Sequence, residues 1–283
     1  MLRFYFVLSG TTFTLAGCTT PMPIMPDALA VPDSYTLVWA DEFDREGLPD
    51  PARWAYDTER NADGWWNEEL QYYSAARSEN ARIENGHLII EARQEPVPIA
   101  QFPDTGGQDY TSARLFTQGL AAWQYGYIEV RAKLPCGRGL WPAIWTLPEG
   151  NSKWPDDGEI DIMEYVGWDE ETFHATVHTR DNNHVLGTQV GETFTSDTAC
   201  GSFHTHSVLW TEDDILVAVN GAPYFRYPND KKGFGEWPFD RPHVLLLNLA
   251  IGGWGGQQGI DPDAFPARME VDYVRVYQKS DGS

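Results

Sequence analysis

The sequence is poor in the features that mark nucleic-acid-binding, nucleotide-binding and helical proteins. It has 20 lysines and arginines against 42 aspartates and glutamates, and this excludes the basic surface that nucleic acids require. No segment repeats apolar residues at helical spacing. The glycine-rich stretch Gly252 to Gly256 encloses a tryptophan and leads into neither a helix nor a lysine, so it is no phosphate cradle. We therefore expect neither a nucleotide nor a nucleic acid as partner.

The chain also has few cysteines, and the first of the three lies in a targeting segment. The apolar run from Phe4 to Leu15 follows a positive start and is too short to span a bilayer as a stable anchor. Leu15-Ala16-Gly17-Cys18 then resembles a bacterial lipobox. We expect residues 1–17 to be a lipoprotein-type signal peptide and Cys18 to carry the lipid. A plain secretory signal with an incidental cysteine is the alternative.

Residues 18–33 contain four prolines and are expected to form a stiff, extended tether. Thr19 stands where an aspartate would indicate retention at the inner membrane, so we expect an exported lipoprotein at the outer membrane or cell surface. In such a compartment the isolated pair Cys136 and Cys200 predicts a disulfide. Neither cysteine has a neighbouring histidine or cysteine at zinc-ligand spacing.

Residues 34–283 have the pattern of one domain built from short strands and turns. Asn220-Gly221 joins two apolar runs and is the strongest hairpin signal in the chain. Strand patterns occur at Tyr127–Leu134, Phe173–Thr179, Ile215–Val219, Ala222–Tyr227, Val244–Leu249 and Val271–Tyr277. We therefore predict an all-β domain of two packed antiparallel sheets.

The segment 158–166 gathers three acids among large apolar residues. In a regular strand Glu159 and Asp161 share one face, but Glu164 would point into the core. One extra residue at Ile162-Met163, a β-bulge, brings all three carboxylates to one surface. Three acids at fixed offsets would arise about once by chance in so acidic a chain. A catalytic acid pair, a metal site and an edge strand with a solvated acidic face therefore remain alternatives at this point.

Longer motifs favour the catalytic acid pair, because they resemble glycoside hydrolase family 16 and its laminarinase-like branch, the endo-1,3-β-glucanases. The matching segments are Asn67–Tyr73, Tyr125–Leu134, Leu140–Trp145, Gly158–Gly167, Asn248–Gly253 and Phe265–Tyr277. The resemblance implies a β-jelly-roll sandwich with a concave sugar-binding cleft, retention of anomeric configuration and no cofactor for catalysis. By motif position Glu159 is implied as the nucleophile and Glu164 as the general acid/base, with Asp161 between them. Retaining chemistry requires two carboxyl groups roughly 5–5.5 Å apart.

The resemblance also implies residues that contact the substrate. Trp141 and Trp145 are four apart on an expected strand, hence on one face, and match sugar-stacking positions; core packing is the alternative. Arg114 and Asn67 match polar cleft contacts. His178 is expected on the polar face of the next strand, near Glu164, unless it is a structural histidine. Trp254 lies on a loop, where contact with a ligand explains an indole better than packing does.

Two segments depart from the usual pattern of the branch. Trp65-Trp66-Asn67-Glu68 replaces a stretch like Gly-Asn-Asn-Glu, so the outer subsites on the non-reducing side are expected to differ. The loop Glu149 to Asp157, which includes Trp154, is expected to shape one edge of the cleft.

Many family members hold a structural calcium away from catalysis, and by position Glu42, Gly86 and Asp272 would supply it here, the first two through backbone oxygens. The partner is expected to be β-1,3-glucan, with mixed-linkage β-1,3-1,4-glucan as a further substrate, and the enzyme is expected to act as a monomer. The alternatives are a hydrolase of a marine galactan such as agarose or carrageenan, a transglycosylase, and a non-catalytic surface glucan-binding protein.

Overall fold

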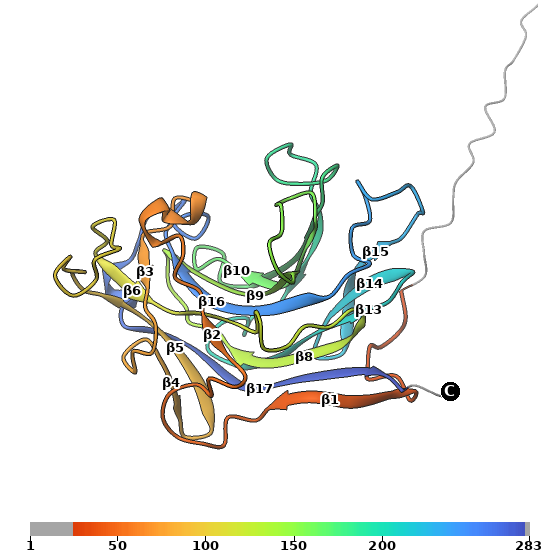
Figure 1. Ribbon diagram of the computed structural model, residues 1–283, viewed down its shortest axis with the longest axis horizontal. Helices are drawn as coiled ribbons and strands as arrows, with labels where there is room; N and C mark the ends of the chain where they lie inside the picture. Colours follow the sequence, from red (N-terminus) through yellow and green to blue (C-terminus); the bar gives the residue numbers. More distant parts are fainter. Residues whose placement is uncertain (1–24, 281–283) are drawn as a thin grey trace, which may run out of the picture.

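The computed structural model describes residues 25–280, which fold into two stacked β-sheets with two short 3-10 helices (Figure 1). The expected signal peptide and the lipidation site Cys18 lie outside these residues. Within the described range, no helix has the length and apolar character needed to cross a membrane. The predicted class, an all-β sandwich of two packed sheets, is confirmed.

The outer sheet has ten strands in the order β15-β14-β13-β8-β17-β5-β6-β3, with β1 paired to β17 and β4 paired to β5. All neighbours are antiparallel except β3 and β6. The strands are β1 (Tyr35–Asp41), β3 (Gln71–Tyr73), β4 (Ala81–Glu84), β5 (His87–Gln94), β6 (Tyr110–Ser112), β8 (Gly126–Lys133), β13 (Phe203–Trp210), β14 (Asp214–Val219), β15 (Ala222–Pro228) and β17 (Ala267–Lys279).

The inner sheet has seven strands in the order β12-β11-β10-β9-β16-β7-β2, and its face away from the core is concave (Figure 1). Helix η1 (Asn61–Trp66) stands above one side of this face, and loops drawn in green stand above the other. The second helix is η2 (Pro262–Ala264). The strands are β2 (Ala55–Tyr56), β7 (Arg114–Phe116), β9 (Leu140–Pro148), β10 (Glu159–Tyr165), β11 (Thr172–His178), β12 (Val190–Thr195) and β16 (His243–Ile251).

Alternating side chains of the two sheets fill the space between them. Strand β8 buries every second residue from Ile128 onward and leaves the residues between partly exposed, as its apolar-charged alternation predicts. The predicted hairpin is confirmed, because Asn220 and Gly221 have φ of 50° and 77° between β14 and β15, as a tight two-residue turn requires. The predicted disulfide Cys136–Cys200 is also confirmed, with 5.2 Å between its Cα atoms.

Part of the expected tether packs against the domain. Leu29 is buried beside Tyr127 and Leu216, and its N–H donates to the carbonyl of Gly221 at 2.8 Å. The apolar side chain gains more from this contact with the outer sheet than from water. Residues 25–33 therefore include a docked segment as well as a connection.

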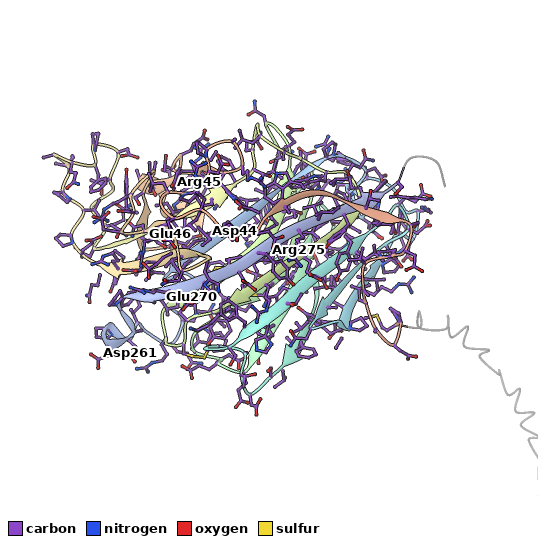
Figure 2. All side chains as sticks on the ribbon, turned by 90° about the horizontal axis from the view of Figure 1, so that it is seen from below. Asp44, Arg45, Glu46, Asp261, Glu270 and Arg275 are labelled. Carbon is purple, nitrogen blue, oxygen red and sulfur yellow. A yellow bond between two sulfur atoms is a disulfide. The ribbon has the colours of Figure 1, made fainter. Side chains whose placement is uncertain are left out.

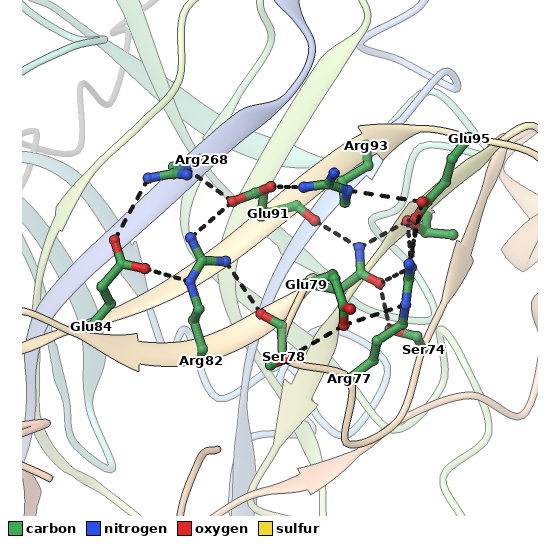
Figure 3. Close-up of polar contacts among 12 residues, drawn as sticks. Ser74, Arg77, Ser78, Glu79, Arg82, Glu84, Glu91, Arg93, Glu95 and Arg268 are labelled. Atoms are coloured by element: carbon green, nitrogen blue, oxygen red, sulfur yellow. Dashed lines mark hydrogen bonds and ion pairs between the residues drawn. The ribbon is translucent and has the colours of Figure 1, made fainter. Parts of the chain in front are cut away.

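The outer sheet carries a network of ion pairs around one buried acid (Figure 3). Glu91 on β5 is 2% exposed and is contacted by Arg82 at 3.0 Å, by Arg268 at 2.9 Å and by Arg93. A buried carboxylate is tolerated only where such partners replace its water. We call Glu91 and these three arginines the Glu91 network.

Candidate active site

Strand β10 carries the three acids and contains the predicted bulge. Its register against β9 shifts between Asp161 and Met163, and its register against β11 shifts between Asp161 and Glu164. The extra residue allows Ile162 and Met163 both to be buried in the core. The bulge is therefore confirmed, and it turns Glu164 to the concave face.

The register explains how Glu159 and Glu164 come to share a face. They pair with His178 and His174 of β11, which are four residues apart, and an even separation returns side chains to the same side of a strand. Asp161 pairs with Thr176, midway between these histidines. Three carboxylates thus face three polar residues of the neighbouring strand.

Glu159 and Glu164, the first and last acids of the set, each accept a hydrogen bond from an indole. Trp154 Nε1 donates to Glu159 Oε2 at 3.0 Å, and Trp141 Nε1 donates to Glu164 Oε1 at 3.1 Å. When Asp161 is protonated its carboxyl donates to Glu159, which lowers the pKa of Glu159 and raises that of Asp161. Glu159 therefore has two donors and Glu164 has one.

Burial shifts the titration of all three acids upward. It is the main cause that raises the pKa of Glu159 to about 8, with the charge of Glu164 as the second cause. Burial likewise raises the pKa of Glu164 to about 7. The pKa of Asp161 is raised well above its ordinary value by burial and by the charges of both glutamates. Near neutral pH the set therefore holds protons that exposed carboxyl groups would have lost.

Burial acts on both glutamates, so their charges and hydrogen bonds bear on where those protons lie. When Glu164 is protonated its charge disappears, and the part of the Glu159 shift that this charge produces disappears too. The donors Asp161 and Trp154 then favour an ionised Glu159. The donors at Glu159, against the single indole at Glu164, thus favour a charged Glu159 next to protonated Asp161 and Glu164.

His178 lies by Glu159 and Asp161, so its expected position near Glu164 was wrong. Its Nε2 is 3.4 Å from Asp161 Oδ2 and 3.9 Å from Glu159 Oε1. The reason is the antiparallel register, which sets the end of β11 against the start of β10. Burial lowers the pKa of His178 to about 4, so the ring is neutral near pH 7. It is His174 that pairs with Glu164.

Glu159, Asp161 and His178 form the group in the described chain whose donor atoms are close enough to hold a cation. One atom each from Glu159, Asp161 and His178 lies within 4.8 Å of the others. A protonated Asp161 that donates to Glu159 is a poor cation ligand, however. The cluster fits carboxylate chemistry better than metal binding.

Arg114 and Trp145 lie on the concave face, as predicted. The guanidinium of Arg114 is sandwiched between the rings of Trp65 at 4.5 Å and Trp145 at 4.7 Å, and its Nε lies 3.0 Å from an oxygen of Asp57. Trp145 Nε1 donates to Asn248 at 2.7 Å. The planar cation is thus fixed on both faces and along one edge.

A buried polar network beside Arg114 was missed from the sequence. Gln71 Nε2 donates to Glu69 at 2.6 Å, Tyr73 donates to Glu69 at 3.3 Å, and Asn248 donates to Tyr73 at 3.1 Å. Burial raises the pKa of Glu69. The segment Asn67 to Tyr73 was recognised only as a motif, and its alternation of acid, glutamine and tyrosine was the available signal.

Of the remaining predicted contacts, Trp141 and Trp254 lie near Glu164, and Asn67 does not. Trp254 packs edge-on against Trp141 with 6.0 Å between ring centroids, and against His174 with 4.8 Å. Asn67 donates to Glu69 at 3.3 Å, so it joins the buried network. Trp141 and Trp145 both point to the concave face, as their spacing predicted.

The expected calcium ligands are engaged with other groups. Glu42 accepts two hydrogen bonds of 2.8 Å from Arg275, which lies on β17 of the outer sheet (Figure 2). Asp272 pairs with Arg131 and lies 3.7 Å from His87. These side chains do not fit a calcium ion as they are paired, and the backbone oxygens of Glu42 and Gly86 would be its main ligands. Calcium binding stays a prediction.

Comparison with known proteins places this geometry in context. Residues 68–275 match the family model of glycosyl hydrolases family 16. A β-glucanase of Rhodothermus marinus is 49% identical over 98% of this chain and 95% of its own length. The crystal structure of SCLam, a non-specific endo-β-1,3(4)-glucanase of that family, superposes with a TM-score of 0.86 at 58% identity, covering 89% of this chain and 94% of that one. The laminarinase structure from Rhodothermus marinus gives 0.81 at 51% identity, covering 87% and 98%.

Proposed function

The chain belongs to glycosyl hydrolases family 16, and on that premise we propose that it is an endo-acting, retaining hydrolase of β-1,3-glucan that also cleaves mixed-linkage β-1,3-1,4-glucan. The carrying observation is the bulged strand β10, which presents Glu159, Asp161 and Glu164 to one face. The relatives support the substrate class, because they include a β-glucanase, a laminarinase and a non-specific endo-β-1,3(4)-glucanase.

In the first step the protonated Glu164 gives its proton to the glycosidic oxygen as the leaving sugar departs. The ionised Glu159 attacks the anomeric carbon and forms a covalent glycosyl-enzyme. Asp161 and Trp154 stabilise the negative charge of Glu159 before the attack. Trp141 keeps the carboxyl of Glu164 in place.

In the second step Glu164, now ionised, takes a proton from water. The resulting hydroxide character at that oxygen drives attack on the anomeric carbon, and Glu159 leaves. Two inversions at one carbon retain the configuration. A sugar hydroxyl in place of water gives transglycosylation by the same route.

A panel of polysaccharides tests the substrate. The purified domain is incubated with laminarin, mixed-linkage β-glucan, agarose and κ-carrageenan, and the oligosaccharide products are resolved by chromatography. We expect a ladder of products from the two glucans. Cleavage of a galactan with none of laminarin would replace this substrate assignment, and binding of laminarin without products would leave a glucan-binding protein.

We further propose that Cys18 carries a lipid and that the enzyme is held at the outer membrane or cell surface. The lipobox-like Leu15-Ala16-Gly17-Cys18 supports this, and the proline-rich segment after it suits a tether. Expression of the full chain and of Cys18→Ala in a bacterial host, followed by membrane fractionation, tests it. Equal release of both forms into the soluble fraction would contradict the lipid anchor.

The domain is expected to be a monomer, and light scattering checks its mass in solution.

A further inference from the structure

The segment 64–68, where η1 ends and a loop begins, holds an exposed tryptophan in a strained conformation. Trp66 is 72% exposed, more than any other large apolar side chain in the described residues. Its φ is 56°, and the residues around it have φ of 57° at Gly64, 52° at Trp65 and 59° at Glu68. Only glycine adopts this left-handed region freely. Strain of this kind occurs where a site requires it, so the position calls for a functional explanation.

This loop is attached to the floor of the active site. The carbonyl of Glu68 accepts from the N–H of Gly253 at 3.0 Å. A Cβ at Gly253 would lie 2.7 Å from the carbonyl oxygen of Asn67 and 2.9 Å from the ring of Trp141. Trp141 is the donor to Glu164, so the loop that carries Trp66 lies against the catalytic floor, where Figure 1 shows η1 above the concave face.

The side chains of the consecutive residues Trp65 and Trp66 point in opposite directions. Trp65 is buried and packs against Arg114 and Tyr73, inside the site. Trp66 points outward, and the guanidinium of Arg60 lies 4.6 Å from its ring centroid. The arginine supports the indole and makes its ring more rigid without covering it, since most of the side chain stays accessible.

On the basis of the proposed function, we propose that Trp66 is a stacking platform for an outer glucosyl unit of the β-glucan chain, beyond the sugars that Arg114 and Asn67 are expected to contact. A β-glucopyranose has equatorial hydroxyls and therefore presents an apolar C–H face that an indole covers well. The proposed site presents no unpaired charge to an uncharged sugar, because the guanidinium of Arg60 lies 3.7 Å from a carboxylate oxygen of Asp63. Long chains reach the platform and short oligosaccharides do not.

The test compares wild type with Trp66→Gly and Trp66→Phe. The measured quantity is the ratio of kcat/KM for laminarin to kcat/KM for a β-1,3-linked tetrasaccharide. We expect this ratio to fall about fivefold in Trp66→Gly, which corresponds to about 1 kcal/mol. Trp66→Phe keeps a ring and is expected to retain most of the ratio. The Tm of Trp66→Gly does not fall, because glycine relieves the strained backbone.

Leu37→Ala serves as a matched control, since Leu37 is 52% exposed on β1 of the outer sheet, and it leaves the ratio unchanged. An unchanged ratio in Trp66→Gly, with laminarin still cleaved by wild type, overturns the platform and leaves the proposed function intact. A fall in Tm with an unchanged ratio means that Trp66 is structural. Wild type that does not cleave laminarin refutes the proposed function itself.

Discussion

Glu91 on the outer sheet and Glu159 on the inner sheet are both largely buried carboxylates, and their surroundings are opposite. Glu91 is 2% exposed and is contacted by three arginines. Glu159 has a side chain 15% exposed and accepts from an indole and a carboxyl group, with a neutral histidine nearby. In the described part of the chain, no arginine or lysine forms an ion pair with Glu159, Asp161 or Glu164.

The surroundings of Glu91 favour stability, whereas those of the catalytic acids favour catalysis. Three cations replace the water that Glu91 lost, so that its charge ties together β4, β5 and β17 (Figure 3). The catalytic acids accept hydrogen bonds only from neutral donors, and the charge of Arg114 lowers the pKa of Glu159 only in part, so much of the desolvation stays uncompensated and the set keeps protons near neutral pH. A cation beside Glu164 would remove its proton and with it the general acid.

The largest expected effect comes from Glu159→Gln. This change removes the nucleophile and a buried carboxyl group that is costly to ionise, so kcat on laminarin falls on the order of 10³-fold or more while Tm does not fall. Initial rates and thermal unfolding measure the two quantities. Glu270→Gln, at a partly buried ion pair with Lys133 on the outer sheet, is the control and leaves kcat unchanged. An active but unstable Glu159→Gln would mean that this acid resembles Glu91.

Glu91→Ala is expected to have the reverse result. Loss of the shared acceptor leaves Arg82, Arg93 and Arg268 facing one another, and the free energy of unfolding falls by about 3 kcal/mol. Because the network lies on the other sheet, kcat/KM for laminarin stays at the wild-type value. Urea unfolding and steady-state kinetics check this prediction.

Glu84→Ala is the matched control for Glu91→Ala. Its carboxylate pairs with the same Arg82 but is 39% exposed, and such a pair contributes under about 1 kcal/mol. Equal losses of stability in the two variants would show that burial of Glu91 carries no special weight.

A smaller effect is expected from Trp154→Phe. The indole N–H is one of the groups that lower the pKa of Glu159, so its loss moves the acidic limb of the kcat/KM profile to higher pH. At pH 6 we expect a decrease of about fivefold, within the range for a partly exposed hydrogen bond to a charged acceptor. A profile that keeps its acidic limb while kcat/KM drops at every pH would indicate a contact with the sugar instead.

The sequence predicts the two-sheet fold and the bulge for a physical reason. Alternation of apolar and polar residues states which side of a strand faces the core, and Ile162-Met163 breaks this alternation at one place only. The position of His178 could also be predicted from the sequence. A short connection between β10 and β11 fixes antiparallel pairing, and counting outward from it places His178 opposite Glu159.

Other features depend on contacts that no local pattern encodes. Asn248 and Tyr73 are 175 residues apart, and their hydrogen bond follows from the stacking of strands rather than from either segment. Trp154 was expected only to shape an edge, because the path of its loop decides whether the indole reaches Glu159. The ion pairs of Glu42 and Asp272 likewise arise from strand pairing across the outer sheet.

The dependence of stability on pH gives the finest comparison between paired and unpaired acids. Burial and the charge of Glu164 raise the pKa of Glu159 from 4.5 to about 8, whereas the hydrogen bond from Arg77 is the main cause that lowers the pKa of Glu95, the residue after β5 of the outer sheet. In the coupled set of Glu159, Asp161 and Glu164 the folded state binds more protons than the unfolded chain between about pH 4.5 and 8, so the contribution of the set to stability falls as pH rises through that window. At Glu95 the folded state binds fewer protons, so its contribution is present above about pH 4.5 and is lost as pH falls further.

These opposite slopes are measured by the Tm of wild type, Glu159→Gln and Glu95→Gln from about pH 3.5 to 8.5. The Tm of Glu159→Gln relative to wild type rises between about pH 5 and 8, because the variant lacks a carboxyl that is costly to ionise in the folded state. The Tm deficit of Glu95→Gln shrinks below about pH 4.5, where wild type also loses the charge that Arg77 stabilises. If both differences had the same sign of slope, the distinction between neutral donors at the catalytic acids and arginines at the outer sheet would not control their titration.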